Sequence, residues 1–165
     1  MRLRGEKGFG MIELLAALSV LNIGILAIVA AFNSGTVALR RASQISTAAA
    51  LGDKQMELYR AIAYNAIVLD TTSVAATDSV YQTDSAYSAS QVTATCSPVV
   101  DSCNPSRAIS SGTSPDKRSY RVDSYIKFAT PAGARQLKQI TIVVRDGDTM
   151  QGLARISSTF DQSTG

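Results

Sequence analysis

The longest apolar stretch of the chain lies close to its N-terminus. Residues 14–32 (LLAALSVLNIGILAIVAAF) are nineteen residues without a charge. As a helix rises about 1.5 Å per residue, this segment spans about 28 Å, close to the hydrocarbon thickness of a bilayer. Basic residues among positions 1–7 precede it. The positive-inside rule then predicts a cytoplasmic N-terminus, one membrane span, and the rest of the chain on the far side.

A helical pattern continues beyond residue 32. Small and apolar residues recur there at alternating spacings of four and three, which is one face of an amphipathic helix. This stripe consists of Ala38, Ala42, Ile45, Ala49, Gly52, Met56, Tyr59 and Ala63. The polar residues 33–35 leave a break open as the alternative. We predict one long helix, residues 10 to about 63, embedded in an apolar environment in its first half and packed on a globular head in its second.

Between Asp70 and Pro115 the composition shifts to serine and threonine, which supply 18 of the 45 residues 71–115. The weak apolar periodicity predicts a long surface loop, with a short strand near 80–81 or 91–95. Cys96 and Cys103 lie in this segment. Across a membrane we expect them to form a disulfide, which stabilises such a short loop by about 2–3 kcal/mol. Two cysteines without histidine do not supply four zinc ligands.

Strand patterns return in the last third of the chain. Residues 120–128, 137–145 and 153–160 are rich in β-branched and aromatic residues, and turn-forming residues separate them at 130–134 and 146–148. We predict three antiparallel strands that pack on the long helix, which makes the fold class α+β. Asp146 and Asp148 offer two carboxylates for a cation, but such a pair is more typical of a simple turn.

Composition narrows the chemistry further. The 165 residues include no histidine, so the chain holds no Ser-His-Asp triad, Cys-His pair or histidine-based zinc site. We find no glycine-rich phosphate loop and no nucleophile beside a base, and we expect no enzyme activity, metal or cofactor. The alternative from another class of function is a single-span membrane-anchored enzyme or binding protein.

The formal charge of +3 is unevenly distributed. Residues 1–8 carry +2 of it, residues 64–116 sum to −4 and residues 117–165 to +4. The two opposite halves predict either complementary faces that attract like subunits or ordinary solvated side chains. Nucleic acid is not an expected partner, because the basic excess is neither strong nor clustered. The group that would contact it comprises Lys117, Arg118, Arg121 and Lys127.

Glu13 stands at the start of the apolar run, where a carboxylate is costly without a partner. A secretory signal has a shorter apolar region, and a plain anchor does not explain the glutamate. The string Lys7-Gly8-Phe9-Gly10-Met11-Ile12-Glu13-Leu14-Leu15 resembles the type IV prepilin family, which includes the pseudopilins. The resemblance implies that prepilin peptidase cuts between Gly8 and Phe9 and that Phe9 is N-methylated. It also implies that Glu13 pairs with the terminal amine of a neighbouring subunit.

The same resemblance divides the chain into a leader (1–8), an apolar helix (9–32), its amphipathic continuation (33–63), a variable loop (64–116) and a sheet head (117–165). Family members loosen this helix on assembly, which implies flexibility at Asn22 and Gly24. The alternative for Gly24 is a small residue that permits close contact between helices. The chain departs from the family pattern because its first proline is Pro98 and its cysteines lie in mid-chain. A mid-chain disulfide is therefore not equated with the one that many pilins have near the C-terminus.

The resemblance implies a minor pilin-like structural subunit, with a pseudopilin of secretion or DNA uptake as the nearest alternative. The implied partners are prepilin peptidase, other pilin subunits, the assembly platform and, before assembly, the inner membrane. The implied location is a single pass through that membrane with the head outside the cytoplasm, followed by a filament in the periplasm or at the cell surface.

Overall fold

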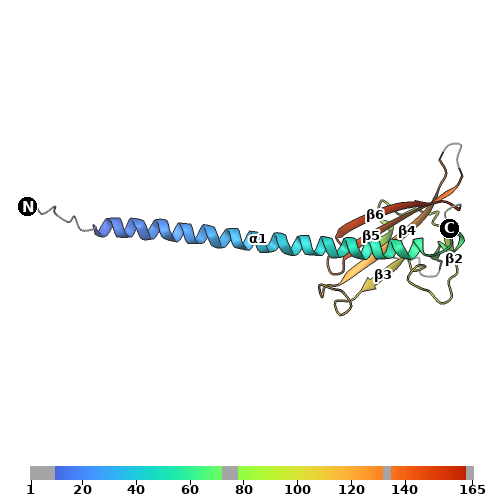
Figure 1. The fold of residues 1–165 in the computed structure, drawn as a ribbon, viewed down its shortest axis with the longest axis horizontal. Coiled ribbons are helices and arrows are strands. Elements are labelled where there is room, and N and C mark those ends of the chain that lie inside the picture. The colour runs from blue at the N-terminus through green and yellow to red at the C-terminus, as the bar shows by residue number, and fades with distance from the viewer. Residues whose placement is uncertain (1–9, 72–77, 132–134, 163–165) are drawn as a thin grey trace, which may run out of the picture. The chain divides into compact units, whose positions relative to one another are not determined.

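The computed structural model describes residues 10–71, 78–131 and 135–162, and it confirms the α+β fold class. The chain forms two compact units, an N-terminal unit (Met1–Ala42) and a head (Ser43–Gly165). Helix α1 (Met11–Arg60) runs through both as one uninterrupted helix, drawn from blue to green in Figure 1. The helix begins one residue after the predicted residue 10 and ends about three residues before the predicted residue 63. The possible break at residues 33–35 does not occur.

The head is built on a four-stranded antiparallel sheet whose strands lie in chain order (Figure 1). These are β3 (Ser106–Ile109), β4 (Tyr120–Ala129), β5 (Leu137–Asp146) and β6 (Gly152–Phe160). The last three lie within two residues of the predicted strands. β3 was not predicted, because four residues inside a serine-rich segment are too few to show a period.

The segment between α1 and β3 also differs from the predicted loop. It contains η1 (Tyr64–Ala66), and β1 (Leu69–Asp70) pairs in parallel with β2 (Thr93–Ala94), which falls within the expected 91–95. The alternative strand at 80–81 was wrong, because these residues belong to the helical turn α2 (Ser79–Gln82). Asp78 caps this turn by accepting a hydrogen bond from the Tyr81 N–H at 3.0 Å.

The main core lies between α1 and one face of the sheet. Alternate residues of β4, β5 and β6 face the helix, and cross-strand partners such as Val122 and Val144 lie on the same face. The buried residues of α1 are Ala48, Gly52, Gln55, Met56 and Tyr59. The predicted stripe is therefore correct in its Gly52, Met56 and Tyr59 part. Ala38, Ala42 and Ile45 are exposed, and Ala63 lies beyond the helix.

Gly52 sets how closely α1 approaches the sheet. A Cβ atom at this position would lie 2.7 Å from Ile156 Cδ1 and 3.4 Å from Val144 Cγ2. The first distance is below ordinary van der Waals contact, so a larger residue would have to displace the Ile156 side chain or move the helix away from it. Close packing of α1 on the sheet therefore explains why the predicted stripe has a glycine at position 52.

Lys138 ties the segment that follows α1 to β5. Its side chain is buried, and its Nζ donates to the carbonyls of Tyr64 at 2.7 Å and Ile67 at 2.8 Å. Burial lowers the pKa of Lys138. The two carbonyls and the Tyr64 ring, whose centre is 4.6 Å from Nζ, compensate the buried ammonium.

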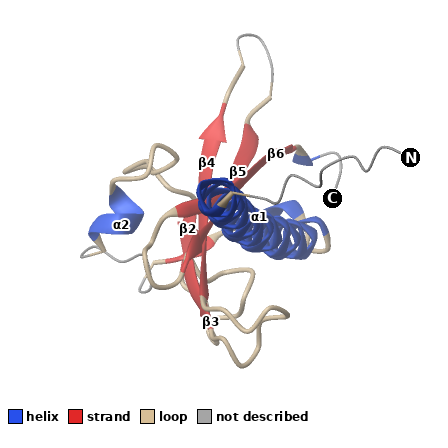
Figure 2. Cartoon of the chain, turned by 90° about the vertical axis from the view of Figure 1, so that its left-hand side faces the viewer, coloured by secondary structure: helices blue, strands red, loops and turns tan. Residues whose placement is uncertain are grey.

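The opposite face of the sheet is covered by a second layer. Figure 2 shows α2 and α1 on opposite sides of the strands. The Tyr81 ring stacks on Tyr125 of β4 with 4.4 Å between centroids, and Ala86 and Val143 complete a small buried cluster. The tyrosine hydroxyls are also bound, since Tyr81 donates to the Ser124 carbonyl at 2.7 Å. Part of the predicted surface loop is therefore a packed layer.

Gly52→Val should destabilise the head by about 1–3 kcal/mol, because the added methyl groups overpack the helix–sheet contact. The free energy of unfolding can be measured by urea titration of the full chain in detergent micelles. All six tyrosines lie between residues 59 and 125, so their near-UV circular dichroism reports the head. Gly35→Val is the matched control, because a Cβ at Gly35 meets nothing within 4 Å. Equal stability of the two variants would contradict the close packing at Gly52.

Candidate functional site

The most unusual surface of the molecule is the apolar part of α1 in the N-terminal unit. Every residue from Met11 to Ala42 is exposed, including Ile23 at 67%, Leu26 at 68% and Phe32 at 72%. The apolar side chains occur on all sides of the helix rather than on one stripe. By length and composition this helix can cross a membrane, and none of its apolar window is buried in the described chain. A helix that is apolar all round requires lipid or protein around it.

The polar side chains of this helix are satisfied locally. Ser19 Oγ donates to the Leu15 carbonyl at 2.9 Å, and Asn22 Nδ2 donates to the Leu18 carbonyl at 3.1 Å. Such bonds to the preceding turn reduce the cost of placing these groups in an apolar environment. The bond of Asn22 keeps this residue within the regular helix. A Cβ atom at Gly24 would meet no other atom within 4 Å. Flexibility at these two residues stays a prediction.

Glu13 lies in the first turn of α1 and is exposed. Its N–H donates to the Gly10 carbonyl at 2.9 Å, so the helix begins just before it. A carboxylate in the first turn interacts favourably with the helix dipole. Its side chain has no ion-pair partner among the residues that the structure describes. Gly8 and Phe9, the predicted cleavage and methylation residues, lie outside the described residues.

A shallow apolar hollow interrupts the surface of α1 at Gly35. Ile28, Phe32 and Leu39 line it together with Ala31 and Thr36. The hollow exists because glycine has no side chain while the residues one turn away are large. It offers a contact for an apolar side chain of an adjacent helix.

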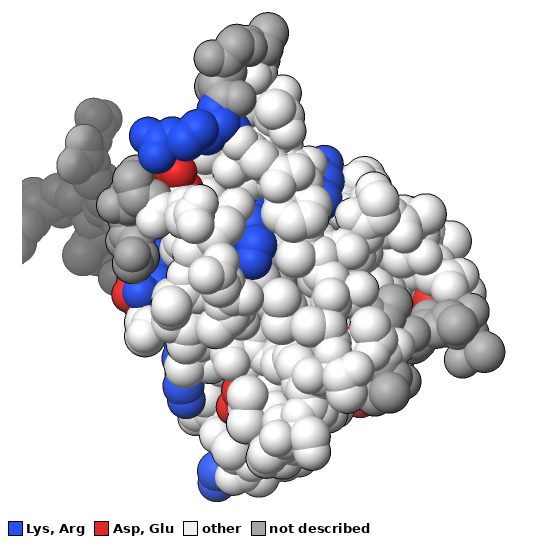
Figure 3. All heavy atoms as spheres, turned by 90° about the vertical axis from the view of Figure 1, so that its right-hand side faces the viewer, with Lys and Arg blue, Asp and Glu red and all other residues white. Residues whose placement is uncertain are grey.

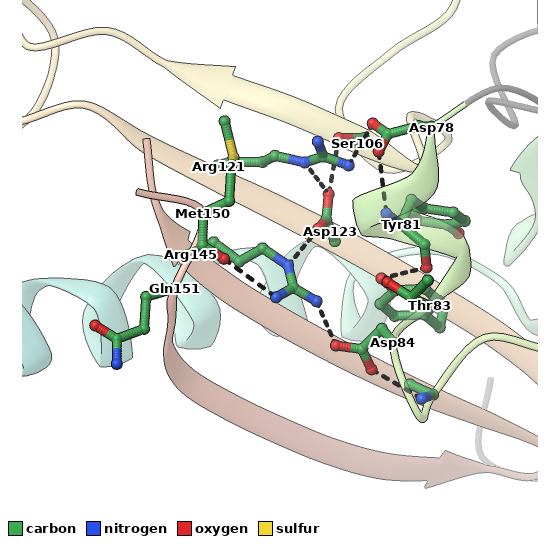
Figure 4. A network of polar contacts seen from close by, with 12 residues as sticks. Asp78, Tyr81, Thr83, Asp84, Ser106, Arg121, Asp123, Arg145, Met150 and Gln151 are labelled. Carbon is green, nitrogen blue, oxygen red and sulfur yellow. Dashed lines mark hydrogen bonds and ion pairs between the residues drawn. The ribbon is translucent and has the colours of Figure 1, made fainter. Parts of the chain in front are cut away.

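The head contains a network of charged side chains on the sheet face opposite α1 (Figure 4). Asp123 of β4, fully buried, is its centre and accepts from Arg121 Nε at 2.7 Å, Arg145 Nε at 3.0 Å and Ser106 Oγ at 2.7 Å. The Arg121 guanidinium also lies 2.7 Å from Asp78 beside α2. Three strands and the covering layer are thus joined through one carboxylate.

Asp84 is the second centre of the same network. Asp84 pairs with Arg145, and its two carboxylate oxygens accept from Arg155 Nη2 at 2.7 and 2.9 Å. The Ala86 N–H donates to the same carboxylate at 2.8 Å. Burial raises the pKa of Asp84, but the Ala86 N–H and the guanidinium groups of Arg155 and Arg145 outweigh it and lower the pKa. The pKa of Asp78 is lowered in the same way by the Tyr81 N–H and Arg121.

These ion pairs correct the interpretation of the two oppositely charged halves. Asp78 and Asp84 belong to the acidic half, and their partners Arg121, Arg145 and Arg155 belong to the basic half. Part of the opposite charge of the two halves is therefore paired inside the head, so these side chains are not simply solvated. The unequal charge of the halves was the available sequence signal, and the strand register decides which residues meet.

The remaining predicted groups have structural surroundings. Cys96 and Cys103 form a disulfide, and Gln55 of α1 donates to the Asp101 carbonyl inside that loop at 2.8 Å. Asp146 Oδ1 accepts from the N–H groups of Asp148 at 3.0 Å and Thr149 at 2.9 Å, which makes it the cap of its own turn. No cluster of three or more potential metal ligands occurs among the described residues.

The basic residues considered for nucleic acid do not form one free group. Arg121 is held by Asp78 and Asp123, with its side chain only 12% exposed. On the face drawn in Figure 3, lysine and arginine side chains lie singly or in small groups between uncharged surface. A scattered arrangement of this kind is not the continuous basic stripe that tracks a phosphate backbone.

Comparisons with known proteins do not identify a family for this chain. No family model, no curated protein and no solved structure matches the chain.

Asp84→Asn should lower the free energy of unfolding of the head by about 3 kcal/mol at neutral pH, because it removes one charge from a nearly buried ion-pair network. Asp84 and Asp78 have lowered pKa values, so their stabilisation is present above the ordinary carboxyl pKa and is lost as the pH falls through the lowered values. The variant should therefore show a weaker loss of stability below about pH 4. Urea titrations from neutral to acid pH measure both effects.

Asp53→Asn, an exposed position on α1, is the control and should leave stability and its pH dependence unchanged. If the free energy of unfolding of Asp84→Asn has the same pH dependence as that of the unsubstituted chain, the ion pairs of Asp84 do not stabilise the layer that covers the sheet.

Proposed function

We propose that the chain is a minor pilin-like structural subunit of a type IV pilus or a related filament. Prepilin peptidase removes residues 1–8, Phe9 becomes the methylated N-terminus, and α1 holds the subunit in the inner membrane before it enters the filament. The head lies outside the cytoplasm. The observation that carries the proposal is the division of one continuous helix into an exposed apolar half and a half that forms the core of an α+β head.

The exposed half of α1 supports assembly through helix packing. If the apolar side chains of residues 14–32 leave lipid, they must be covered by equivalent side chains of other subunits, since each buried Leu, Ile or Phe contributes about 1.5–3 kcal/mol relative to water. The hollow at Gly35 gives a neighbouring helix a place for one apolar side chain. Neither contact requires the head, which leaves its surface free to vary.

Glu13 supports the pairing step of the proposal. A new amine at Phe9 would stand four residues before Glu13, about one helical turn away. In an apolar filament core, a carboxylate of one subunit and an amine of the next neutralise one another only at one axial offset. The pair therefore selects the register of adjacent helices more than it adds stability.

A pseudopilin of a type II secretion or DNA-uptake system satisfies the same observations and remains within the proposed class. The alternative of a membrane-anchored enzyme has weaker support. The charged groups of the head network are bound to one another on the covered sheet face, and the chain has no histidine to act as a base.

The first prediction concerns processing. In cells that contain a prepilin peptidase, intact mass analysis should show loss of residues 1–8 and one added methyl group on Phe9. In cells without the peptidase the full chain should persist, with an otherwise unchanged head. A chain cut after Ala30 or Ala31, or left uncut in the presence of the peptidase, would reject the prepilin assignment.

The second prediction concerns assembly. Glu13→Gln keeps the size of the side chain but removes its charge, so processing should stay intact while incorporation into sheared filaments falls at least about tenfold, as expected for loss of about 1.4 kcal/mol of pairing per subunit. Glu57→Gln is the matched control on the same helix, where Glu57 pairs with Arg60 at the surface of the head. Equal incorporation of both variants would rule out the pairing role.

A further inference from the structure

The net positive charge of the described residues comes from one place on α1. Residues 43–165 hold eleven basic and eleven acidic side chains, so the head is neutral. Residues 10–42 hold only Glu13, Arg40 and Arg41 as charged groups. Among the described residues, the arginine doublet outweighs the single negative charge of Glu13 and accounts for the net positive charge.

The doublet has no partner within the described chain. Arg40 and Arg41 are exposed, and no ion pair or hydrogen bond of their guanidinium groups occurs there. The next acidic residue along the helix is Asp53, about 18 Å further on at about 1.5 Å per residue. By contrast, Arg121, Arg145 and Arg155 in the head are all held by carboxylates.

The position of the doublet matches the thickness of a bilayer. The uncharged helix from Leu14 to Leu39 spans about 39 Å, and a bilayer with its headgroups is about 40–45 Å thick. Residues 14–32 fill the hydrocarbon region, and the polar Asn33, Ser34 and Thr36 fall at the headgroup level. Side chains on a helix lean toward its N-terminus, so the guanidinium groups of the doublet reach back to this level.

We propose that Arg40 and Arg41 bind the phosphate groups of lipid headgroups in the leaflet away from the cytoplasm and so fix the depth of α1 before assembly. The inference rests on the membrane-anchored state of the proposed function. A guanidinium group matches phosphate through two parallel N–H donors. Adjacent helix positions point about 100° apart, so the two arginines contact two different lipids. A subunit entering a filament has to release both contacts.

The test uses the full chain in vesicles of phosphatidylcholine and phosphatidylglycerol. The chain has no tryptophan, so Phe32→Trp, an exposed aromatic position, adds a single fluorescent reporter. Quenching by lipids brominated at different acyl positions measures its depth. Adding Arg40→Gln and Arg41→Gln should move the reporter deeper by about one helical turn, roughly 5 Å, because the headgroup contacts no longer hold the helix.

Two further variants make the result specific. Arg40→Lys with Arg41→Lys keeps the charge and should keep most of the depth, and Lys54→Gln, an exposed lysine on the head part of α1, should leave the depth unchanged. An inserted reporter whose depth is the same in the double glutamine variant would overturn the lipid contact alone. A reporter that no brominated lipid quenches would show that α1 does not insert, which overturns the membrane-anchored state as well.

Discussion

The contact between the second half of α1 and the sheet is the constraint on which the rest of the structure depends. It is close because Gly52 faces Ile156 and Val144 without a side chain between them. It also contains the largest buried side chains of the helix, Met56 and Tyr59. The same continuous helix also carries the apolar residues that precede this contact. Those apolar side chains are exposed in the described chain.

The two faces of the sheet are stabilised by different interactions. The face toward α1 is an apolar core, with Ile126, Ile140 and Ile142 at its centre. The other face is held by stacked tyrosines and by carboxylates shared between arginines, so its covering layer depends on charge. A small head can add a second layer in this way, because paired charges avoid the cost of isolated buried charges.

The same principle separates the two kinds of charge in the molecule. In the head, opposite charges from distant segments meet in ion pairs. On the N-terminal unit, Glu13 and the arginine doublet stand at the two ends of an uncharged helix and have no partner in the described chain. In our proposals each end receives its partner from outside, lipid phosphate for the doublet before assembly and an amine of a neighbouring subunit for Glu13 in the filament.

The amino-acid sequence by itself determined the long helix, its apolar first half and the three long strands, because each has a hydrophobic period, an uncharged run or a β-rich composition over eight or more residues. It also marked Glu13, because a carboxylate stands out beside nineteen uncharged residues. Only the tertiary structure decided the strand β3, the turn α2 and the pairing of Asp84 with Arg145 and Arg155. The Asp84 pairs join residues 61 and 71 positions apart, and β3 forms by pairing with β4. A short polar segment has no period of its own that would predict such contacts.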